Sequence, residues 1–315
     1  MNFMIQNNNQ NTPRPLYIGI DGGGSKCRAK VSSADGSIIG VGVSGRANPL
    51  HGLDKTIESI LESTYLAIAN AGLDASAIHE LSAGVGLAGV NLPSLFDKVS
   101  NWEHPFKEMF LTTDLHIACL GAHAWKGDEP QNGAAIITGT GSCGIAIANG
   151  KAKIYGAHGF PLGDQSSGAW YGWQAICASL LAYDDLGPKT SILEKLCQKL
   201  DTDAPNITDL MSGKPPKEYA KLAYLIFSEA KAGDTVATGI VEKGADYINR
   251  MAHKIIDDYG VPLCLLGGLR TELVPWLDQK VQSYLSEPID APEDGAIRLA
   301  KSRRKQLHEN FAESL

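Results

Sequence analysis

The stretch ITGTGSCGIAIANGKAKI, residues 137–154, decides the fold of this chain. Its first three glycines have the G-x-G-x-x-G spacing of a dinucleotide-binding turn, which needs a strand before it, a helix after it and an acidic residue about 20 positions on. A strand-like AAIIT precedes the turn, and Asp164 follows it. The next residues, however, form two apolar runs around Asn149-Gly150, the signature of a hairpin turn. Because a strand leaves the glycines, a phosphate site on a helix N-terminus is not predicted.

The N-terminal part of the chain repeats this plan. LYIGIDGGGSKCRAKVSSADGSIIGVGVSG, residues 16–45, reads as strand, glycine turn, strand, a turn at Asp35-Gly36 and a third strand. Residues 134–156 have the same order of three strands and two turns. Turns of small residues between two strands present several backbone N–H groups to one anion. Two copies predict two similar halves that share a ligand in a central cleft.

The remaining segments alternate between helical and strand patterns, which predicts an α/β fold. Helices are predicted over residues 53–72, 115–125, 166–183, 238–260, 269–285 and 294–311, and further strands over 79–90, 108–113 and 261–268. The region 187–219 is predicted to be rich in loops. A chain of 315 residues is long enough for two domains. Their expected bounds are 16–117 and 118–289, with a tail over 1–15 and a final helix over 290–315 that returns to the first domain.

The amino-acid composition of the chain argues against two classes of binding partner, nucleic acid and membranes. The formal net charge of -7 argues against nucleic acid or an anionic membrane, which require a basic surface, and the basic residues at 301–305 are interpreted as a solvated helix face. No apolar run approaches the ~20 residues of a membrane span. The polar, low-complexity tail is expected to be disordered. Six cysteines are spread singly, without a CxxC pair or a signal peptide, which favours reduced thiols and a cytoplasmic location.

Asp21 is the first candidate for chemistry. It lies in GIDGGGSK, residues 19–26, which is not a Walker A loop because that motif places Lys before Ser and continues as a helix. A carboxylate at the end of a strand, directly before three glycines, can hold a hydrated magnesium ion while the turn N–H groups approach phosphates. The alternative is a tight hairpin in which Asp21 only forms the turn.

Asp114 follows a predicted strand, at the edge where open α/β sheets bind ligands. It could accept a proton from a substrate hydroxyl, or it could cap the next helix. Asp164 in GFPLGDQSSGAW and Asn48 in SGRANPL could bind sugar hydroxyls or stabilise their own turns. Three more side chains share a predicted helix face but lack a fourth ligand, so a metal site is not favoured there: His116, Cys119 and His123.

Together, these pieces resemble the actin, hexokinase and heat-shock chaperone ATPase superfamily. Within it, residues 16–301 resemble the N-acetylglucosamine and glucosamine kinases of the BadF/BadG/BcrA/BcrD ATPase family. IDGGGSK is similar to the first phosphate motif, ITGTGSCG to the second, and LLGGL, residues 265–269, to the adenosine motif. TTDLHIACLGAH and GFPLGDQSSGAW are similar to segments of the amino-sugar kinases. The resemblance implies two ribonuclease H-like (actin-like ATPase) domains with a central cleft.

The resemblance also implies ATP and Mg²⁺ as cofactors and phosphorylation of an amino sugar at its C6 hydroxyl. Asp114 would be the base, Asn48 and Asp164 would bind the ring hydroxyls, and Asp21 would position magnesium. The other implied substrate contacts are Thr138, Gly139 and Gln165. The implied phosphate and adenosine contacts are Gly22, Gly23, Gly24, Ser25 and Lys26 in the first turn, Gly139, Thr140, Gly141 and Ser142 in the second, and Gly267 and Gly268.

The sequence departs from the family pattern at two places, of which the first leaves the choice between glucosamine and N-acetylglucosamine open and the second keeps the hydroxyl group. Asp164-Gln165 stands where eukaryotic N-acetylglucosamine kinases have Asp-Glu and looks more like bacterial glucosamine kinases, and Ser25 stands where relatives usually have Thr. Two other functions are considered: an ATPase that activates a reductase or dehydratase partner, and a sugar-binding regulator without turnover. The scattered cysteines argue against the iron–sulfur cluster of such activators. A homodimer is suggested only by relatives.

Overall fold

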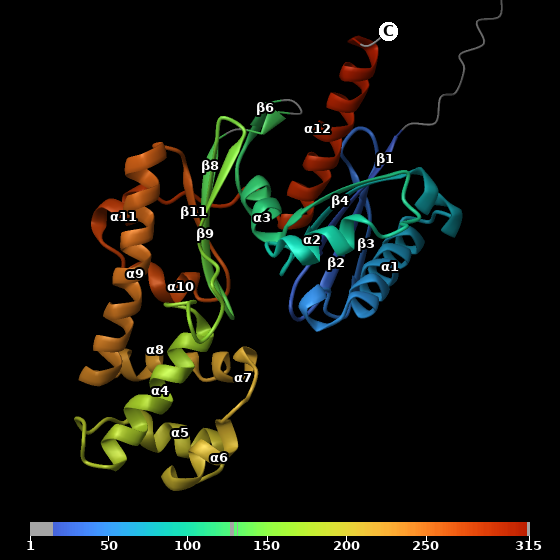
Figure 1. Ribbon diagram of the computed structural model, residues 1–315. Helices are drawn as coiled ribbons and strands as arrows, with labels where there is room; N and C mark the ends of the chain where they lie inside the picture. The colour runs from blue at the N-terminus through green and yellow to red at the C-terminus, as the bar shows by residue number, and fades with distance from the viewer. Residues whose placement is uncertain (1–14, 127–128, 131, 314–315) are drawn as a thin grey trace, which may run out of the picture. The chain divides into compact units, whose positions relative to one another are not determined.

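The computed structural model describes residues 15–126, 129–130 and 132–313, so the predicted tail lies outside this part of the chain apart from Pro15. The chain divides into two compact units (Figure 1). Unit 1 combines Met1–Ile117 with Pro292–Leu315, and unit 2 is Ala118–Ala291. Unit 1 is therefore built from both ends of the sequence, whereas unit 2 is continuous. The division falls inside α3 (Asp114–Ala122).

Unit 1 contains a five-stranded sheet in the order β3-β2-β1-β4-β5. The strands are β1 (Leu16–Gly22), β2 (Cys27–Ser32), β3 (Ile38–Ser44), β4 (Leu81–Leu87) and β5 (Glu108–Thr113). β1, β2 and β3 form the predicted antiparallel meander, while β4 and β5 run parallel to β1. Gly22 pairs with Leu87, which pairs with Thr113, so the carboxyl ends of the three parallel strands are level.

Helices cover both faces of this sheet. α1 (Leu53–Asn70) packs so closely on β3 that a Cβ on Gly42 would lie 2.0 Å from the carbonyl oxygen of Ser63. α12 (Pro292–Glu313) packs on β1 and β4, and there the register partners Gly19 and Gly84 lie directly under its backbone. Because side chains alternate between the two faces of a strand, Gly42 lies on the face of the sheet opposite to that of Gly19. The shorter elements are η1 (Pro49–His51), η2 (Ala75–Glu80) and α2 (Pro93–Ser100).

Unit 2 contains a four-stranded sheet in the order β10-β9-β8-β11. Its strands are β8 (Gly133–Thr138), β9 (Ser142–Ala148), β10 (Lys151–Gly156) and β11 (Leu263–Leu266). The first three form an antiparallel meander, and β11 runs parallel to β8. The plan is that of β1, β2, β3 and β4, which confirms the predicted α/β fold with two similar halves. β9 also confirms that a strand leaves the glycine turn at 139–141.

The longest helix of unit 2, α9 (Thr235–Tyr259), runs along this sheet, as Figure 1 shows in orange. Asp234 caps its first turn by accepting from the N–H of Ala237 at 2.9 Å, and Gly260 ends it in the left-handed conformation. Met251 of α9 fills the space above Gly144, where a Cβ would lie 2.6 Å from its sulfur. The other elements are α4 (Gly168–Tyr183), α5 (Ile192–Leu200), η3 (Ala204–Asn206), α6 (Ile207–Met211), α7 (Pro216–Ala220), α8 (Ala223–Lys231), α10 (Arg270–Leu273), η4 (Val274–Trp276), α11 (Gln279–Tyr284), β6 (Trp125–Lys126) and β7 (Glu129–Pro130).

Two predictions in unit 2 are wrong. The region 187–219 is largely helical, because α5, α6 and α7 are short helices whose apolar residues pack together in one cluster that includes Leu196, Ile207 and Met211. Such short helices are stabilised by tertiary packing rather than by their own propensity. The single helix predicted over 269–285 is broken at Pro275, and Asp278 caps a new helix by accepting from the N–H of Val281.

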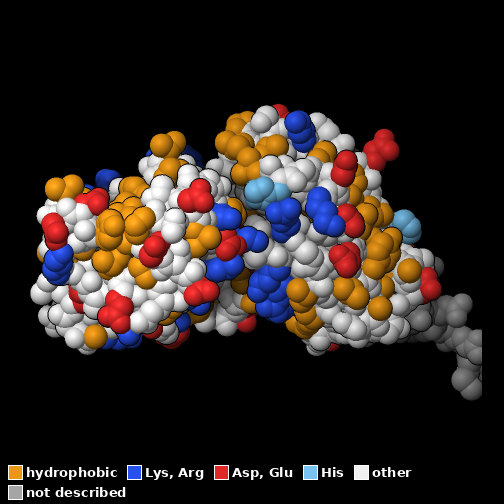
Figure 2. Space-filling view, turned by 90° about the horizontal axis from the view of Figure 1, so that it is seen from below, with side chains coloured by type: hydrophobic (Ala, Val, Ile, Leu, Met, Phe, Trp, Pro, Cys, Tyr) orange, Lys and Arg blue, Asp and Glu red, His pale blue; other side chains and the backbone are white. Residues whose placement is uncertain are grey.

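The surface mixes charges of both signs. Figure 2 shows acidic and basic side chains interspersed over one face. Within the part of the chain that the structure describes, no helix combines the length and apolarity that crossing a membrane would need.

Candidate active site

The carboxyl ends of the parallel strands in unit 1 bring two predicted site residues to one edge of the sheet. Asp21 is the penultimate residue of β1, and Asp114 directly follows β5. β4 lies between these strands, so they are separated by two strand spacings, about 10 Å. This edge is where open α/β sheets bind ligands. The sequence therefore predicted correctly where both carboxylates lie in the sheet.

The electrostatic surroundings of Asp21 raise its pKa from 3.8 to about 7. Burial is the largest cause, followed by the carboxylates of Asp114 and Glu293, while Lys26 and Arg28 oppose them. At neutral pH the site is therefore short of positive charge. A divalent cation would supply that charge and favour the ionised carboxylate.

We expect Asp21→Asn to stabilise the protein, and more so at high pH. Because the pKa of Asp21 is about 7 in the folded state and 3.8 otherwise, the folded protein retains a proton that the unfolded chain releases. The contribution of Asp21 to stability is therefore fully present below about pH 4 and is lost as the pH rises through 7. With a chelator present, the gain from Asp21→Asn should be about 2 kcal/mol larger at pH 8 than at pH 5. Thermal unfolding at the two pH values measures this, and equal gains would contradict it.

The first glycine turn is fixed by hydrogen bonds to its carbonyl groups. The N–H of Ala88 donates to Gly22 O at 2.8 Å, and the N–H of Ala47 donates to Gly23 O at 3.0 Å. Since the C=O and N–H of a planar trans peptide point in opposite directions, the N–H of Gly24 points away from Ala47. Gly24 is exposed, and a Cβ there would meet no atom within 4 Å. The turn thus directs a backbone donor away from Ala47, at an exposed residue beside the exposed Ser25 and Lys26.

Asn48 lies close to this turn. Its side-chain oxygen accepts from the N–H of Leu50 at 3.0 Å and so caps η1. The same oxygen lies 2.5 Å from the position of a Cβ on Gly89, which has a φ of 86°. Asn48 therefore has the local capping role that the sequence offered as one alternative, and a sugar contact through its amide N–H₂ group stays a prediction.

Asp114 is not the residue that caps α3. Thr113 takes that role, because its hydroxyl oxygen accepts from the N–H of His116 at 3.1 Å. The Asp114 carboxylate accepts from the adjacent N–H of Leu115 at 2.8 Å. Burial raises the pKa of Asp114, and the N–H groups of Leu115 and of Asp114 itself partly oppose this. A half-buried carboxyl with a raised pKa and no capping role is suited to accepting a proton.

The three candidate metal ligands after Asp114 have separate partners. His116 Nδ1 lies 2.8 Å from the hydroxyl of Thr112, and burial, with a smaller effect from Arg303, lowers its pKa. The Cys119 thiol donates to Gly133 O at 3.5 Å, and His123 Nε2 lies 2.7 Å from Ala134 O. These contacts explain all three side chains as structural.

The second glycine turn, in unit 2, is fixed in the same manner as the first. The first N–H groups of α4, from Gly168 and Ala169, donate to Gly139 O at 2.8 Å and to Thr140 O at 3.2 Å. By peptide planarity, the N–H groups of Thr140 and Gly141 point away from α4. The helix N-terminus is therefore occupied by the turn, and it is the turn that offers donors to an anion.

The end of β11 lies next to this turn. Gly267 has a φ of 98°, and a Cβ there would lie 2.2 Å from Thr138 O, so only glycine fits. Thr138 is buried, and its hydroxyl donates to Leu266 O at 3.3 Å, which is a structural contact rather than an exposed one. Gly268 is exposed, and a Cβ there would meet nothing within 4 Å. The backbone of these two glycines is thus accessible at the end of β11.

Asp164 lies against the second turn. Its carboxylate accepts from the N–H groups of Ser142 and Phe160, and one of its oxygens lies 2.8 Å from the position of a Cβ on Gly141. Burial raises the pKa of Asp164, while the Ser142 N–H, His158 and the Phe160 N–H act in the opposite direction. The residues predicted to bind sugar and phosphate in unit 2 are therefore in direct contact.

Two residues near Asp21 were not predicted. Arg28 is the register partner of Asp21 on β2, and its Nε lies 3.0 Å from a carboxylate oxygen of Glu293 on α12. Glu293 is almost fully buried. The alternation along β2 could have placed Arg28 beside Asp21, whereas no local signal links Glu293 to it.

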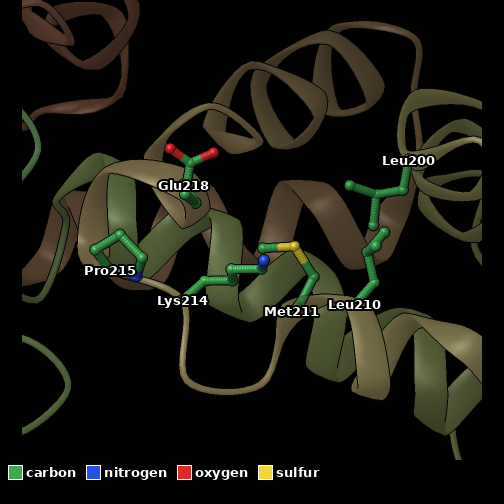
Figure 3. Close-up of a pocket in the computed structure, with 6 residues that line it drawn as sticks. All are labelled: Leu200, Leu210, Met211, Lys214, Pro215 and Glu218. Carbon is green, nitrogen blue, oxygen red and sulfur yellow. The ribbon is translucent and has the colours of Figure 1, made fainter.

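A pocket of about 430 Å³ lies elsewhere, at α5, α6 and α7 (Figure 3). Leu200 and Leu210 meet at one end of it and Pro215 lies at the other, with Met211, Lys214 and Glu218 as the remaining lining residues. No residue of the predicted site lines it. The predicted site residues therefore lie outside this pocket, at strand ends and turns within each unit.

Comparisons with known proteins match one family over most of the chain. The model of the BadF/BadG/BcrA/BcrD ATPase family matches residues 18–297. The glucosamine kinase GspK of Vibrio cholerae is 31% identical over 294 residues, covering 93% of this chain and 98% of GspK. The N-acetylmuramic acid/N-acetylglucosamine kinase of Clostridium acetobutylicum is 30% identical, covering 72% of this chain and 75% of that protein. A solved structure from Chromobacterium violaceum, of a protein proposed to be an N-acetylglucosamine kinase, has a TM-score of 0.84 at 27% identity and covers 91% of this chain and 99% of that one.

Proposed function

The chain belongs to the BadF/BadG/BcrA/BcrD ATPase family, and on that basis we propose that it is an ATP-dependent amino-sugar kinase. The reaction would transfer the terminal phosphoryl group of ATP to the C6 hydroxyl of glucosamine or N-acetylglucosamine. The observation that carries the proposal is the placement of Asp114. Asp114 directly follows β5 at the carboxyl edge of the sheet. Thr113, rather than Asp114, caps α3, and burial raises the pKa of Asp114. A protein that only bound sugar would have no need of such a base.

In the proposed reaction, Asp114 accepts the proton of the sugar C6 hydroxyl as this oxygen attacks phosphorus. Phosphoryl transfer depends mainly on positioning and on stabilisation of charge. The backbone N–H groups of Gly24, Thr140 and Gly141 would donate to phosphate oxygens, since each points away from the segment that holds its turn in place. The backbone at Gly267 and Gly268 would lie against adenosine.

The residues around Asp21 fit a magnesium ion. Mg²⁺ retains several waters and is usually bound through one or two carboxylates together with substrate phosphates. Asp21 supplies such a carboxylate in surroundings that lack positive charge, as its raised pKa indicates. When bound there, Mg²⁺ would neutralise charge on the phosphates. Arg28, paired with Glu293 of α12, would attract the Asp21 carboxylate from the neighbouring strand.

The proposed substrate is either glucosamine or N-acetylglucosamine. One relative is named a glucosamine kinase and another an N-acetylmuramic acid/N-acetylglucosamine kinase, at nearly equal identity. Gln165 beside Asp164 makes the sugar loop less negative than an Asp-Glu pair would, which reduces attraction for a charged amine. We also propose a cytoplasmic location, supported by six cysteines that are spread singly along the sequence and by the use of ATP.

The proposal predicts ADP release that depends on an amino sugar. Purified protein with ATP and Mg²⁺ is assayed with glucosamine, N-acetylglucosamine, glucose or no sugar. We expect one amino sugar to raise the rate at least tenfold above the sugar-free rate, because the bound sugar supplies an acceptor hydroxyl held in position. Equal ADP release with and without sugar would instead favour an ATPase activator. Binding of sugar without any ADP release would favour a regulator.

A further inference from the structure

Two segments of unit 2 with different proposed ligands are joined by hydrogen bonds. The phosphate turn is defined here as residues 139–142, and the sugar loop as residues 157–167. The hydroxyl of Ser142 donates to Gln165 O at 2.5 Å, and the N–H of Ser142 donates to the Asp164 carboxylate. Directly after the loop, Gly168 and Ala169 donate to the carbonyl groups of Gly139 and Thr140. The turn and the loop therefore form one connected network.

Ser142 is the centre of this network. The residue is only 2% exposed, and a serine has two hydrogens to donate, one on its hydroxyl and one on its backbone nitrogen. Both are directed at the sugar loop, to Gln165 O and to Asp164. Phosphate oxygens are acceptors, so in this arrangement Ser142 has no hydrogen left for one. Its position in the phosphate turn is thus not explained by direct binding of ATP.

The sugar loop needs such support because its backbone is strained. Asp164 and Ser166 have φ values of 61° and 65°, in the left-handed region that costs energy for residues other than glycine. Ala157 at the start of the loop has a φ of 60°. Strained residues of this kind persist only where their surroundings fix them. The bonds from Ser142 meet the loop at Asp164, which is itself strained, and at Gln165, which lies between the two strained residues.

We propose that Ser142 is a positioning residue that couples sugar binding to ATP binding within unit 2. A sugar held by Asp164 and Gln165 would order the loop, and Ser142 would transmit this order to the turn whose N–H groups bind phosphate. Each ligand would then lower the ordering cost of the other, which gives positive cooperativity without a large movement. The inference rests on the proposed function, because it assumes that the loop binds sugar and the turn binds phosphate.

Isothermal calorimetry tests this coupling. The affinity for a non-hydrolysable ATP analogue with Mg²⁺ is measured with no sugar and with saturating glucosamine or N-acetylglucosamine. For the unaltered protein we expect sugar to tighten analogue binding by at least about fivefold, the lower end of typical coupling factors. For Ser142→Ala the factor should fall to less than about twofold. Ser142→Cys, which keeps the side-chain size but has a weaker donor, should lie between them.

A matched variant in the same turn separates coupling from direct binding. Thr140 is exposed, and Thr140→Ala also deletes one hydroxyl. It should leave the coupling factor unchanged, even if the affinity for the analogue falls, because any lost contact is lost with and without sugar. Thermal unfolding of each variant shows that it is folded. If Ser142→Ala does not fold, Ser142→Cys decides the question.

The possible results have distinct meanings. Unaltered protein that binds neither the analogue nor an amino sugar overturns the proposed function, and the coupling with it. Binding of both ligands without any coupling, or coupling that Ser142→Ala and Ser142→Cys both retain, overturns the role of Ser142 and leaves the kinase proposal intact. Equal loss of coupling in Thr140→Ala would show that the whole turn, rather than Ser142, transmits it.

Discussion

Asp114→Asn is expected to lower the turnover number for sugar-dependent ADP release by roughly 10²–10⁴-fold, the range typical of a lost general base. The amide has nearly the same size as the carboxyl, and its oxygen can still accept from the N–H of Leu115. It cannot take up the proton of the sugar hydroxyl. We therefore expect the loss to appear in kcat, while the affinity for sugar changes by only a few fold. Thr113 still caps α3, so the fold should be retained.

Asp97→Asn provides the matched control, because Asp97 is an exposed carboxylate of unit 1 on α2, outside the proposed site. Its turnover number should equal that of the unaltered protein. Sugar binding by both variants is followed by calorimetry. A kcat for Asp114→Asn within about threefold of the unaltered value would show that Asp114 is not the base. Loss of sugar affinity at unchanged kcat would make Asp114 a binding contact only.

Gly84→Ala is expected to destabilise unit 1 by about 3 kcal/mol or more, at the upper end of the cost of overpacking. A Cβ on Gly84 would lie 1.9 Å from Ala296 O and 2.7 Å from Ala296 C. Both atoms belong to the backbone of α12, so no change of rotamer can relieve the overlap and the helix has to shift. The unfolding temperature should fall by roughly 6–12 °C. Differential scanning calorimetry measures it.

Gly239→Ala is the control for this substitution. Gly239 lies inside α9 of unit 2, and a Cβ there would meet no atom within 4 Å. Alanine should raise the stability of α9 by up to about 1 kcal/mol, since glycine is the poorer helix former. If Gly84→Ala melts at the same temperature as the unaltered protein, the close packing of α12 on β4 is not present in solution. Limited proteolysis should also cleave α12 faster in Gly84→Ala.

The strands and turns of the site were predictable because their signals are local. Three strands with two glycine-containing turns recur twice, and each turn is defined by a few adjacent residues. Asp21 and Asp114 were placed correctly because each directly adjoins the end of an apolar strand, and parallel strands bring those ends to one edge. Alternation and turn chemistry act over a few residues, which is the range that a sequence pattern covers.

The remaining features depend on contacts between distant segments. Thr113 and Asp114 are both good capping residues, and only the structure shows that Thr113 caps α3. Glu293 reaches the surroundings of Asp21 through the packing of α12 on Gly19, which no nearby residue signals. The donors of Ser142 are taken by a loop more than twenty positions later whose left-handed backbone conformations are not those that Asp and Ser usually adopt.

The construction of unit 1 from both ends of the sequence has a consequence for biosynthesis. While the nascent chain leaves the ribosome, β1 to β5 emerge first, but the surface over Gly19 and Gly84 stays bare until α12 has been made. Unit 2 is continuous and can complete its core before then. Until α12 has been made, one face of the N-terminal sheet is therefore exposed to water, and in this state the sheet is most accessible to chaperones and proteases. A message cut short before codon 292 would leave this face permanently uncovered, so the N-terminal sheet depends on a helix made after the whole of unit 2.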